Sequence, residues 1–198
     1  MGTRGIMGFR CGGDDKLTYN YSDSDPHWLG VYVLGDLKSF IADYKHTTQQ
    51  RLREIFDNIT IVGQEDKPSM EQVEELEKRF PGRLKVGCGN AAYDVLRDFQ
   101  GDISAYLAGL KWMVGNNDFI KDSLFCEWGY IVNIDTMRLE VWRGFQRKPD
   151  KTNRYGHKRD RNNKKYYPCA MLISFDLFEL PSEADFVGAI ETTEALAS

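Results

Sequence analysis

The sequence predicts a single α+β domain, with an antiparallel sheet built from the two ends of the chain and helices packed against it. Apolar residues alternate with a period of two near both ends, whereas between about residues 28 and 113 they recur every three to four positions. The 198 residues are 41% hydrophobic and 28% charged, which suits one ordinary globular core. Strands that flank a helical middle are typical of the α+β class.

The N-terminal region is expected to form a β-hairpin. Residues 4–10 and 16–21 have the strand pattern, and Gly12-Gly13-Asp14-Asp15 between them favours a tight turn. The polar run 22–26 ends the second strand and offers side chains that can cap a helix. From Trp28 onward the pattern becomes helical.

The middle of the chain is predicted to be helical. One helix should run from Trp28 to Tyr44, and another should begin at Ser69, which forms a capping box with Gln72. That second helix should end before Pro81-Gly82. The remaining helical stretches are expected at residues 48–57, 91–99 and 103–113.

The period of two returns after residue 124. Residues 125–135 and 138–145 are predicted to form a hairpin across Thr136-Met137, and residues 169–175 a further strand. One face of the hairpin should carry Trp128, Tyr130, Val132 and Ile134. From Pro181 the chain is acidic and rich in small residues. We therefore expect one domain over residues 1–181 and an acidic tail, helical at best, over residues 182–198.

Several function classes lack a signal in this sequence. No apolar run is long enough for a membrane helix, and the first residues do not have the layout of a secretory signal. The cysteines and histidines show no metal-ligand spacing, and Cys11, in a turn, is expected to be a silent thiol. Gly87–Ala92 matches a dinucleotide fingerprint but is interpreted as a turn that leads into a helix, because no acidic residue stands at the required distance. We expect a cytoplasmic protein without metal or cofactor.

Charge is concentrated in the segment 147–165. It holds nine Lys and Arg residues against two Asp, so its local charge is +7 while the rest of the chain carries −11. It has no aliphatic residue and is expected to be an exposed loop. One interpretation is a solvated loop, and the other is an arm that binds nucleic acid or an acidic partner. The candidate binding residues are Arg154, Lys158, Arg159, Arg161, Lys164 and Lys165.

A second group of polar residues surrounds the predicted N-terminal hairpin. Thr3, Arg4 and Gly5 precede the first strand, and short polar side chains come after the second. Arg4 could pair with a carboxylate and lock the N-terminus onto the sheet, or it could anchor the anionic group of a small ligand. The ligand-binding candidates are Arg4, Asn20, Ser22 and Asp25.

The same region resembles the N-terminal-nucleophile hydrolases in layout. A Thr preceded by a Gly enters a strand–turn–strand that leads to an acidic loop, here Gly2-Thr3, the hairpin and Asp23 or Asp25. The resemblance implies that a processed Thr3 would be the nucleophile and its own α-amine the base, with Asp23 as an accompanying acid. With Met1 and Gly2 attached, Thr3 has no α-amine.

The chain also resembles a functionally unsettled family of short proteins from phages, bacteria and fungi. The opening Met1–Gly5, the loop Tyr19–Pro26 and the hairpin sequences Glu127–Val132 and Leu139–Gly144 carry the resemblance. The family usually has Tyr where this chain has Asp25, and it lacks the long basic insertion. The resemblance implies a phage-encoded protein and a shared architecture.

The function that these observations favour is a non-catalytic binding protein that acts on a host component or a small anionic ligand, through the polar N-terminal residues or the basic segment. An amide hydrolase with Thr3 as nucleophile and a nucleic-acid binder that uses residues 147–165 are the alternatives. The oligomeric state stays open.

Overall fold

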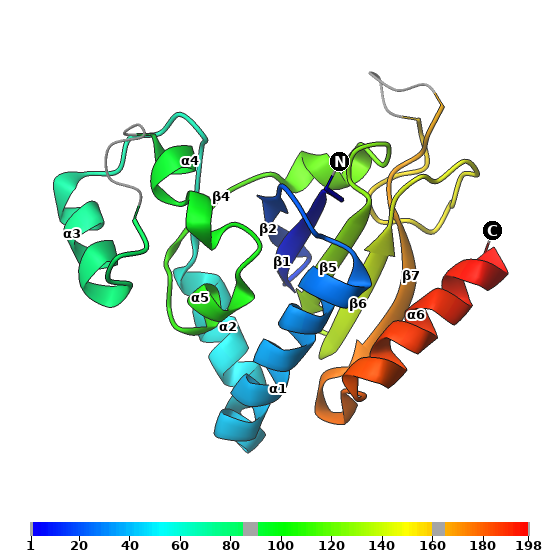
Figure 1. Cartoon of the computed structure of the whole chain (residues 1–198), viewed down its shortest axis with the longest axis horizontal. Helices are drawn as coiled ribbons and strands as arrows, with labels where there is room; N and C mark the ends of the chain where they lie inside the picture. Colours follow the sequence, from blue (N-terminus) through cyan, green and yellow to red (C-terminus); the bar gives the residue numbers. More distant parts are fainter. Residues whose placement is uncertain (1, 85–90, 160–164, 198) are drawn as a thin grey trace.

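The computed structural model describes residues 2–84, 91–159 and 165–197, and it has the α+β architecture (Figure 1). A five-stranded sheet has the strand order β2-β1-β5-β6-β7. The strands are β1 (Gly5–Cys11), β2 (Asp14–Asn20), β5 (Trp128–Asn133), β6 (Arg138–Arg143) and β7 (Ala170–Asp176). Both predicted hairpins are therefore present, β1 with β2 and β5 with β6.

The sheet is not wholly antiparallel, which corrects one expectation. β1 pairs in parallel with β5, with Gly5 opposite Trp128, whereas the other neighbouring strands are antiparallel. A parallel pair needs a long crossover between its strands. The helical middle of the chain provides that crossover between Asn20 and Trp128.

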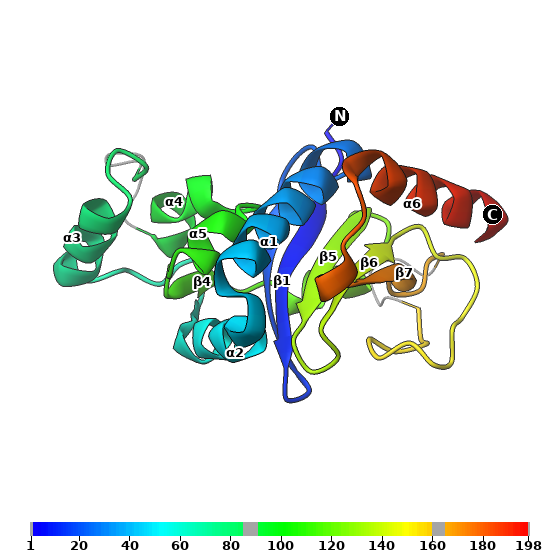
Figure 2. The ribbon, with the colours of Figure 1, turned by 90° about the horizontal axis from the view of Figure 1, so that it is seen from below.

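Two long helices cover one face of the sheet (Figure 2). They are α1 (Val31–Tyr44), which comes after a π-helical turn over Pro26–Gly30, and α6 (Glu183–Ala197). Further α-helices are α2 (Thr48–Asn58), α3 (Met70–Arg79), α4 (Ala92–Val95) and α5 (Ile103–Leu107). α3 begins with the expected capping box, in which Ser69 and Gln72 bond each other's backbone amides.

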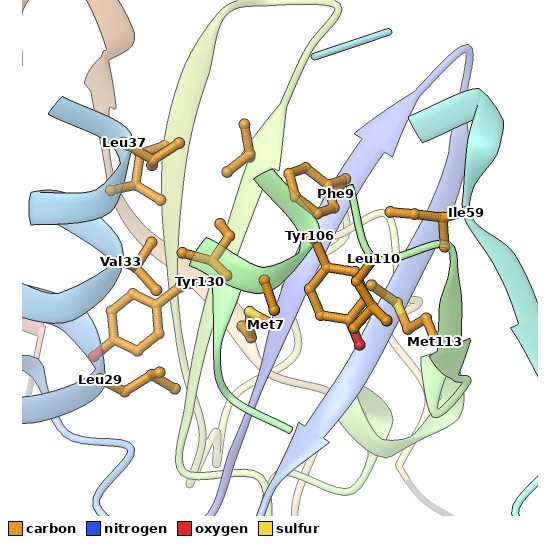
Figure 3. Packing of buried hydrophobic residues seen from close by; sticks show 14 of the residues in the cluster. Met7, Phe9, Leu29, Val33, Leu37, Ile59, Tyr106, Leu110, Met113 and Tyr130 are labelled. Atoms are coloured by element: carbon orange, nitrogen blue, oxygen red, sulfur yellow. The ribbon is translucent and has the colours of Figure 1, made fainter. Parts of the chain in front are cut away.

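The main core lies between this sheet face and the helices (Figure 3). Met7, Phe9 and Tyr130 come from the strands and meet Leu37 and Tyr106 from the helices, all of them buried. The expected apolar face of the second hairpin belongs to this core. A smaller cluster lies on the opposite face and consists of Ile6, Leu17, Ile120, Cys126, Ile131, Trp142 and Cys169.

The helix expected over residues 103–113 is wrong in its second half. α5 ends at Leu107, and Gly109 has a φ of +96°, a left-handed conformation that suits glycine and stops the helix. Residues Trp112–Val114 instead form β4, which pairs in parallel with β3 (Thr60–Val62) as a separate two-stranded sheet.

The C-terminal segment is helical, as the sequence allowed, but it packs on the domain instead of extending from it as a tail. α6 packs on the sheet through the fully buried Phe186 and Ile190, so this helix contributes to the domain core. These two apolar residues lie one helical turn apart and face the same side. Within the described residues, no helix is long and apolar enough to cross a membrane.

Candidate functional site

The polar residues singled out in the sequence gather at one edge of the sheet, which we call the upper edge. It is the edge where β1, β5 and β7 begin and where β2 and β6 end, as the pairings of Gly5 with Asn20 and of Trp128 with Arg143 show. Because side chains alternate along a strand, those at this edge divide between the helix-covered face and the opposite face.

Thr3 and Asp25 meet on the helix-covered side of the upper edge. Thr3 Oγ1 lies 3.5 Å from Asp25 Oδ2, and the carbonyl of Thr3 accepts the amide of Ser24 at 3.2 Å. The other oxygen of Asp25 accepts the amide of His27 at 3.0 Å and caps the π-helical turn. Thr3 therefore does pair with an acidic residue, but that residue is Asp25 and not Asp23. Asp25 also caps the π-helical turn.

Asn20 fixes the loop between β2 and this turn. Its Nδ2 donates to the carbonyl of Ser22 at 2.6 Å and to Oγ of the buried Ser24 at 2.8 Å. Tyr130 donates its hydroxyl to the Ser24 carbonyl at 3.1 Å, and Asp23 accepts the Leu29 amide through its carbonyl. Asn20, Ser22 and Asp23 thus have structural bonds within the loop.

Arg4 does not join this group, which corrects the expected polar cluster. Its guanidinium stacks on the ring of Phe125 at 4.5 Å, on the face opposite α1 and α6. Burial raises the pKa of the nearby Tyr19 hydroxyl, and Arg4 opposes that shift. No ion pair joins Arg4 to Asp23 or Asp25 in the described part of the chain.

The basic segment is not a uniformly free arm. Arg154 packs on the sheet and donates Nη1 and Nη2 to the two carboxylate oxygens of Glu140 at 2.9 and 2.6 Å. Its guanidinium stacks on the rings of Trp142 and Tyr155. Arg154 is therefore unsuited to bind a phosphate, because it would have to leave a buried carboxylate. Lys158, Arg159 and Lys165 are exposed, and Arg161 and Lys164 lie outside the described residues.

A cleft of about 430 Å³ opens beside the upper edge, where β6 ends. It lies between the chain that leaves β6, strand β7 and the last turns of α6. Three cationic side chains and one carboxylate line it. The lining residues are Arg143, Gly144, Phe145, Gln146, Arg147, Lys148, Leu172 and Glu194.

The three cations of the cleft differ in how strongly they are held. Arg143 donates Nε to Glu194 at 2.5 Å and Nη1 to the Glu127 carbonyl at 3.0 Å, and it stacks on Trp128. Arg147 and Lys148 are exposed, and in the described part of the chain neither has a carboxylate within ion-pair distance. The Arg147 guanidinium lies over the Tyr166 ring, 6.0 Å from its centre, a contact that leaves its N–H groups able to bind an anion, and Lys148 has the same charge.

Sequence reasoning missed this cleft as a site. In the sequence, Arg147 and Lys148 stand out only as members of the basic segment, and Arg143 only as part of a strand. The available signal was the run Arg143–Lys148 at the end of a predicted strand, in which cationic residues flank Gly, Phe and Gln. Leu172 and Glu194 could not have been assigned, since they join the cleft only through the fold.

Other candidates for chemistry do not assemble. Among the residues described, no three His, Cys, Asp or Glu side chains gather as a metal site. Burial, together with the weaker effect of the Asp135 charge, raises the pKa of the Cys11 thiol, which disfavours the reactive thiolate. Cys126 and Cys169 are buried as expected. Cys88 and most of the Gly87–Ala92 motif lie outside the described residues.

Comparisons of the chain with protein-family models, with curated proteins and with solved structures gave no match.

Proposed function

We propose that this protein is a non-catalytic binding protein for a small anionic ligand, which the upper-edge cleft holds. The observation that carries the proposal is the pair Arg147 and Lys148, two exposed cations on the wall of a concave site. Phosphate and carboxylate groups are bound in this way by a guanidinium fork and a mobile ammonium. The volume of about 430 Å³ suits a small molecule.

The lining of the cleft combines one cation held in place, Arg143, with two exposed cations, Arg147 and Lys148. Arg143 is held by Glu194 and Glu127, so it contributes a positioned charge that needs no rearrangement. Leu172 adds an apolar surface to the same cleft. This combination of a few polar groups with apolar surface is typical of small-molecule sites. The resemblance of the opening motif to a family with phage members makes a molecule of the host cell the expected ligand source.

Calorimetric titration with inorganic phosphate and with adenosine monophosphate tests the proposal. We expect binding of at least one of the two by the full chain, weakened at least tenfold in the double variant Arg147→Ala and Lys148→Ala. The double variant Lys38→Ala and Lys78→Ala is the matched control, because it removes two exposed cations from α1 and α3. Equal binding by the two double variants would contradict the proposal.

The Thr3–Asp25 contact favours a second candidate, the amide hydrolase with Thr3 as nucleophile. The 3.5 Å distance between Thr3 Oγ1 and Asp25 Oδ2 meets the geometric demand for an acid beside the hydroxyl. The chemistry would require removal of Met1 and Gly2, since only then is the α-amine of Thr3 free to act as the base.

Intact-protein mass spectrometry on untagged material tests this candidate. A chain that starts at Thr3 would support the hydrolase, and an activity screen of the Thr3→Ala variant would be the next step. A chain that starts at Met1 or Gly2 would remove Thr3 as an N-terminal nucleophile and leave the binding proposal in place.

A further inference from the structure

Phe145 has a backbone conformation that a large side chain rarely adopts. Its φ is +58°, in the left-handed region where a Cβ crowds the backbone, and non-glycine residues there are strained. The tight turn at the preceding Gly144 imposes this conformation on Phe145. A Cβ on Gly144 would collide with the carbonyl oxygens of Cys126 and Ser123, so the chain turns tightly at this point.

The strain at Phe145 is not compensated by burial of its ring. The side chain remains 37% exposed and lines the cleft. Asn or Gly would fit the same backbone with less strain, and either would expose less apolar surface. Strained backbone in a protein is concentrated at positions that serve a ligand or a switch. We therefore infer that Phe145 serves function and not the stability of the fold.

The ring of Phe145 is held in a fixed orientation. The Arg143 guanidinium lies 5.0 Å from its centre, and the Tyr166 ring meets it edge-on with the centres 6.1 Å apart. The Phe145 amide also donates to the Ser123 carbonyl at 2.6 Å. These contacts present an aromatic surface at a constant position beside the exposed cations Arg147 and Lys148.

We propose that Phe145 is a stacking platform and that the ligand joins a planar aromatic ring to an anionic group, as a nucleoside monophosphate does. The inference rests on the proposed function and assigns the class of its ligand. The base stacks on the Phe145 ring, and Arg147 and Lys148 bind the phosphate. Stacking on an aromatic side chain tolerates any base, because every base has a π-face.

The alternative occupant is a single strand of nucleic acid, and three observations favour the mononucleotide. The whole chain is acidic, with a net charge of −4, so its overall field repels a long polyanion. Arg154, a cation of the basic segment that packs on the sheet, is bound by Glu140 instead of extending the cationic surface. The cleft itself is of small-molecule size.

Three probes separate the parts of the ligand. The full chain is titrated calorimetrically with adenosine monophosphate, inorganic phosphate and adenosine. We expect the monophosphate to bind at least tenfold more tightly than phosphate, and adenosine to bind more weakly than the monophosphate. No binding of either anion would overturn the proposed function. Equal affinity for monophosphate and phosphate would overturn the stacking platform alone.

Variants of Phe145 then separate a ligand role from a structural one. Phe145→Asn and Phe145→Gly should weaken adenosine monophosphate binding at least fivefold, leave phosphate binding unchanged and keep the melting temperature at or above that of the parent. Phe178→Asn is the matched control, because Phe178 is an exposed Phe outside the cleft. A fall in the melting temperature of both Phe145 variants with unchanged monophosphate affinity would show a structural role and overturn the proposal.

A single-stranded pentanucleotide decides between the two occupants. Affinity for the pentanucleotide close to that for the monophosphate is expected, since one base and one phosphate fill the cleft. Binding more than a hundredfold tighter, with a steep loss on adding salt, would overturn the mononucleotide assignment in favour of nucleic acid.

Discussion

Arg154 and Glu140 form a bidentate ion pair on the sheet face that α1 and α6 leave uncovered. The two bonds measure 2.9 and 2.6 Å, and the Glu140 side chain is only 6% exposed. Asn133 and Trp142 donate to the same carboxylate at 2.8 and 3.0 Å, so all of its strong acceptor positions serve the fold. The pair ties the basic segment to the sheet.

Breaking this pair should destabilise the protein strongly. Glu140→Ala leaves a half-buried guanidinium without its partner, and we expect the free energy of unfolding in urea to fall by about 3–5 kcal/mol. The control is Glu54→Ala, which removes an exposed carboxylate paired with Arg51 at 2.9 Å. That surface pair should contribute at most about 1 kcal/mol. Equal losses in the two variants would show that the buried pair does not hold the segment.

The stability that Glu140 contributes should depend on pH. Burial by itself raises the pKa of this carboxyl, but the hydrogen bonds from Arg154 and Asn133 outweigh it and hold the pKa below the ordinary value of 4.5. A carboxyl with a depressed pKa in the folded state stabilises the fold above its unfolded pKa and loses that effect as the pH falls through the folded value. The difference in unfolding free energy between parent and Glu140→Gln should therefore be constant above about pH 5 and shrink below about pH 4.5. A difference that stays constant down to about pH 2.5 would contradict this.

Lys16 should stabilise the C-terminal end of α2. Its ammonium donates to the carbonyls of Phe56 and Ile59 at 2.6 and 2.7 Å and lies 4.4 Å from the centre of the Phe56 ring. Lys16→Met keeps most of the apolar stem but removes the ammonium donor from both carbonyls, of which Phe56 keeps the Ile59 amide at 3.2 Å, so we expect a loss of about 1–3 kcal/mol in unfolding free energy. Lys38→Met, on the exposed side of α1, should change it by less than about 0.5 kcal/mol. Similar losses of unfolding free energy in Lys16→Met and Lys38→Met would show that Lys16 does not stabilise the end of α2.

α6 should be essential for the fold and not a detachable tail. Phe186→Ala leaves a cavity between the helix and the sheet, where the Phe186 ring meets Phe175 with the centres 4.9 Å apart. Such a cavity costs about 3–5 kcal/mol, measured by chemical denaturation. Leu196→Ala, at a side chain 85% exposed near the end of the same helix, should be neutral. A neutral Phe186→Ala would mean that α6 is not docked in solution.

Local patterns predicted those parts of the fold that depend on neighbours in the chain. The alternation from Trp128 to Ile134 and the turn at Thr136-Met137 specify a hairpin, and Ser69 with Gln72 specifies a helix start. α6 could have been predicted from the spacing of Phe186 and Ile190, but the small, acidic residues around them obscured it. Gly109 was the missed stop signal before β4, which forms only because β3 provides it with a partner strand.

The candidate site was harder to predict because its residues come from distant segments. Phe145, Leu172 and Glu194 reach the same cleft from three parts of the chain. In the sequence, Arg154 stands among other cations and therefore looks like a phosphate-binding residue. Nothing near it in the sequence indicates that Glu140 on β6 binds it. Arg4 was a plausible partner for Asp25, but strand alternation turns Arg4 to the opposite face of the sheet.

Mapping the bound ligand on the full chain is the sharpest test of the binding proposal. Amide chemical shifts are recorded by nuclear magnetic resonance while adenosine monophosphate is added. We predict that the shifts concentrate at residues 143–148 and at Leu172 and Glu194, which line the cleft. The residues around the separate pocket of about 360 Å³ near Leu76 and Trp112 should stay unchanged. Shifts confined to that second pocket, or no shifts at millimolar nucleotide, would contradict the assignment of the cleft as the binding site.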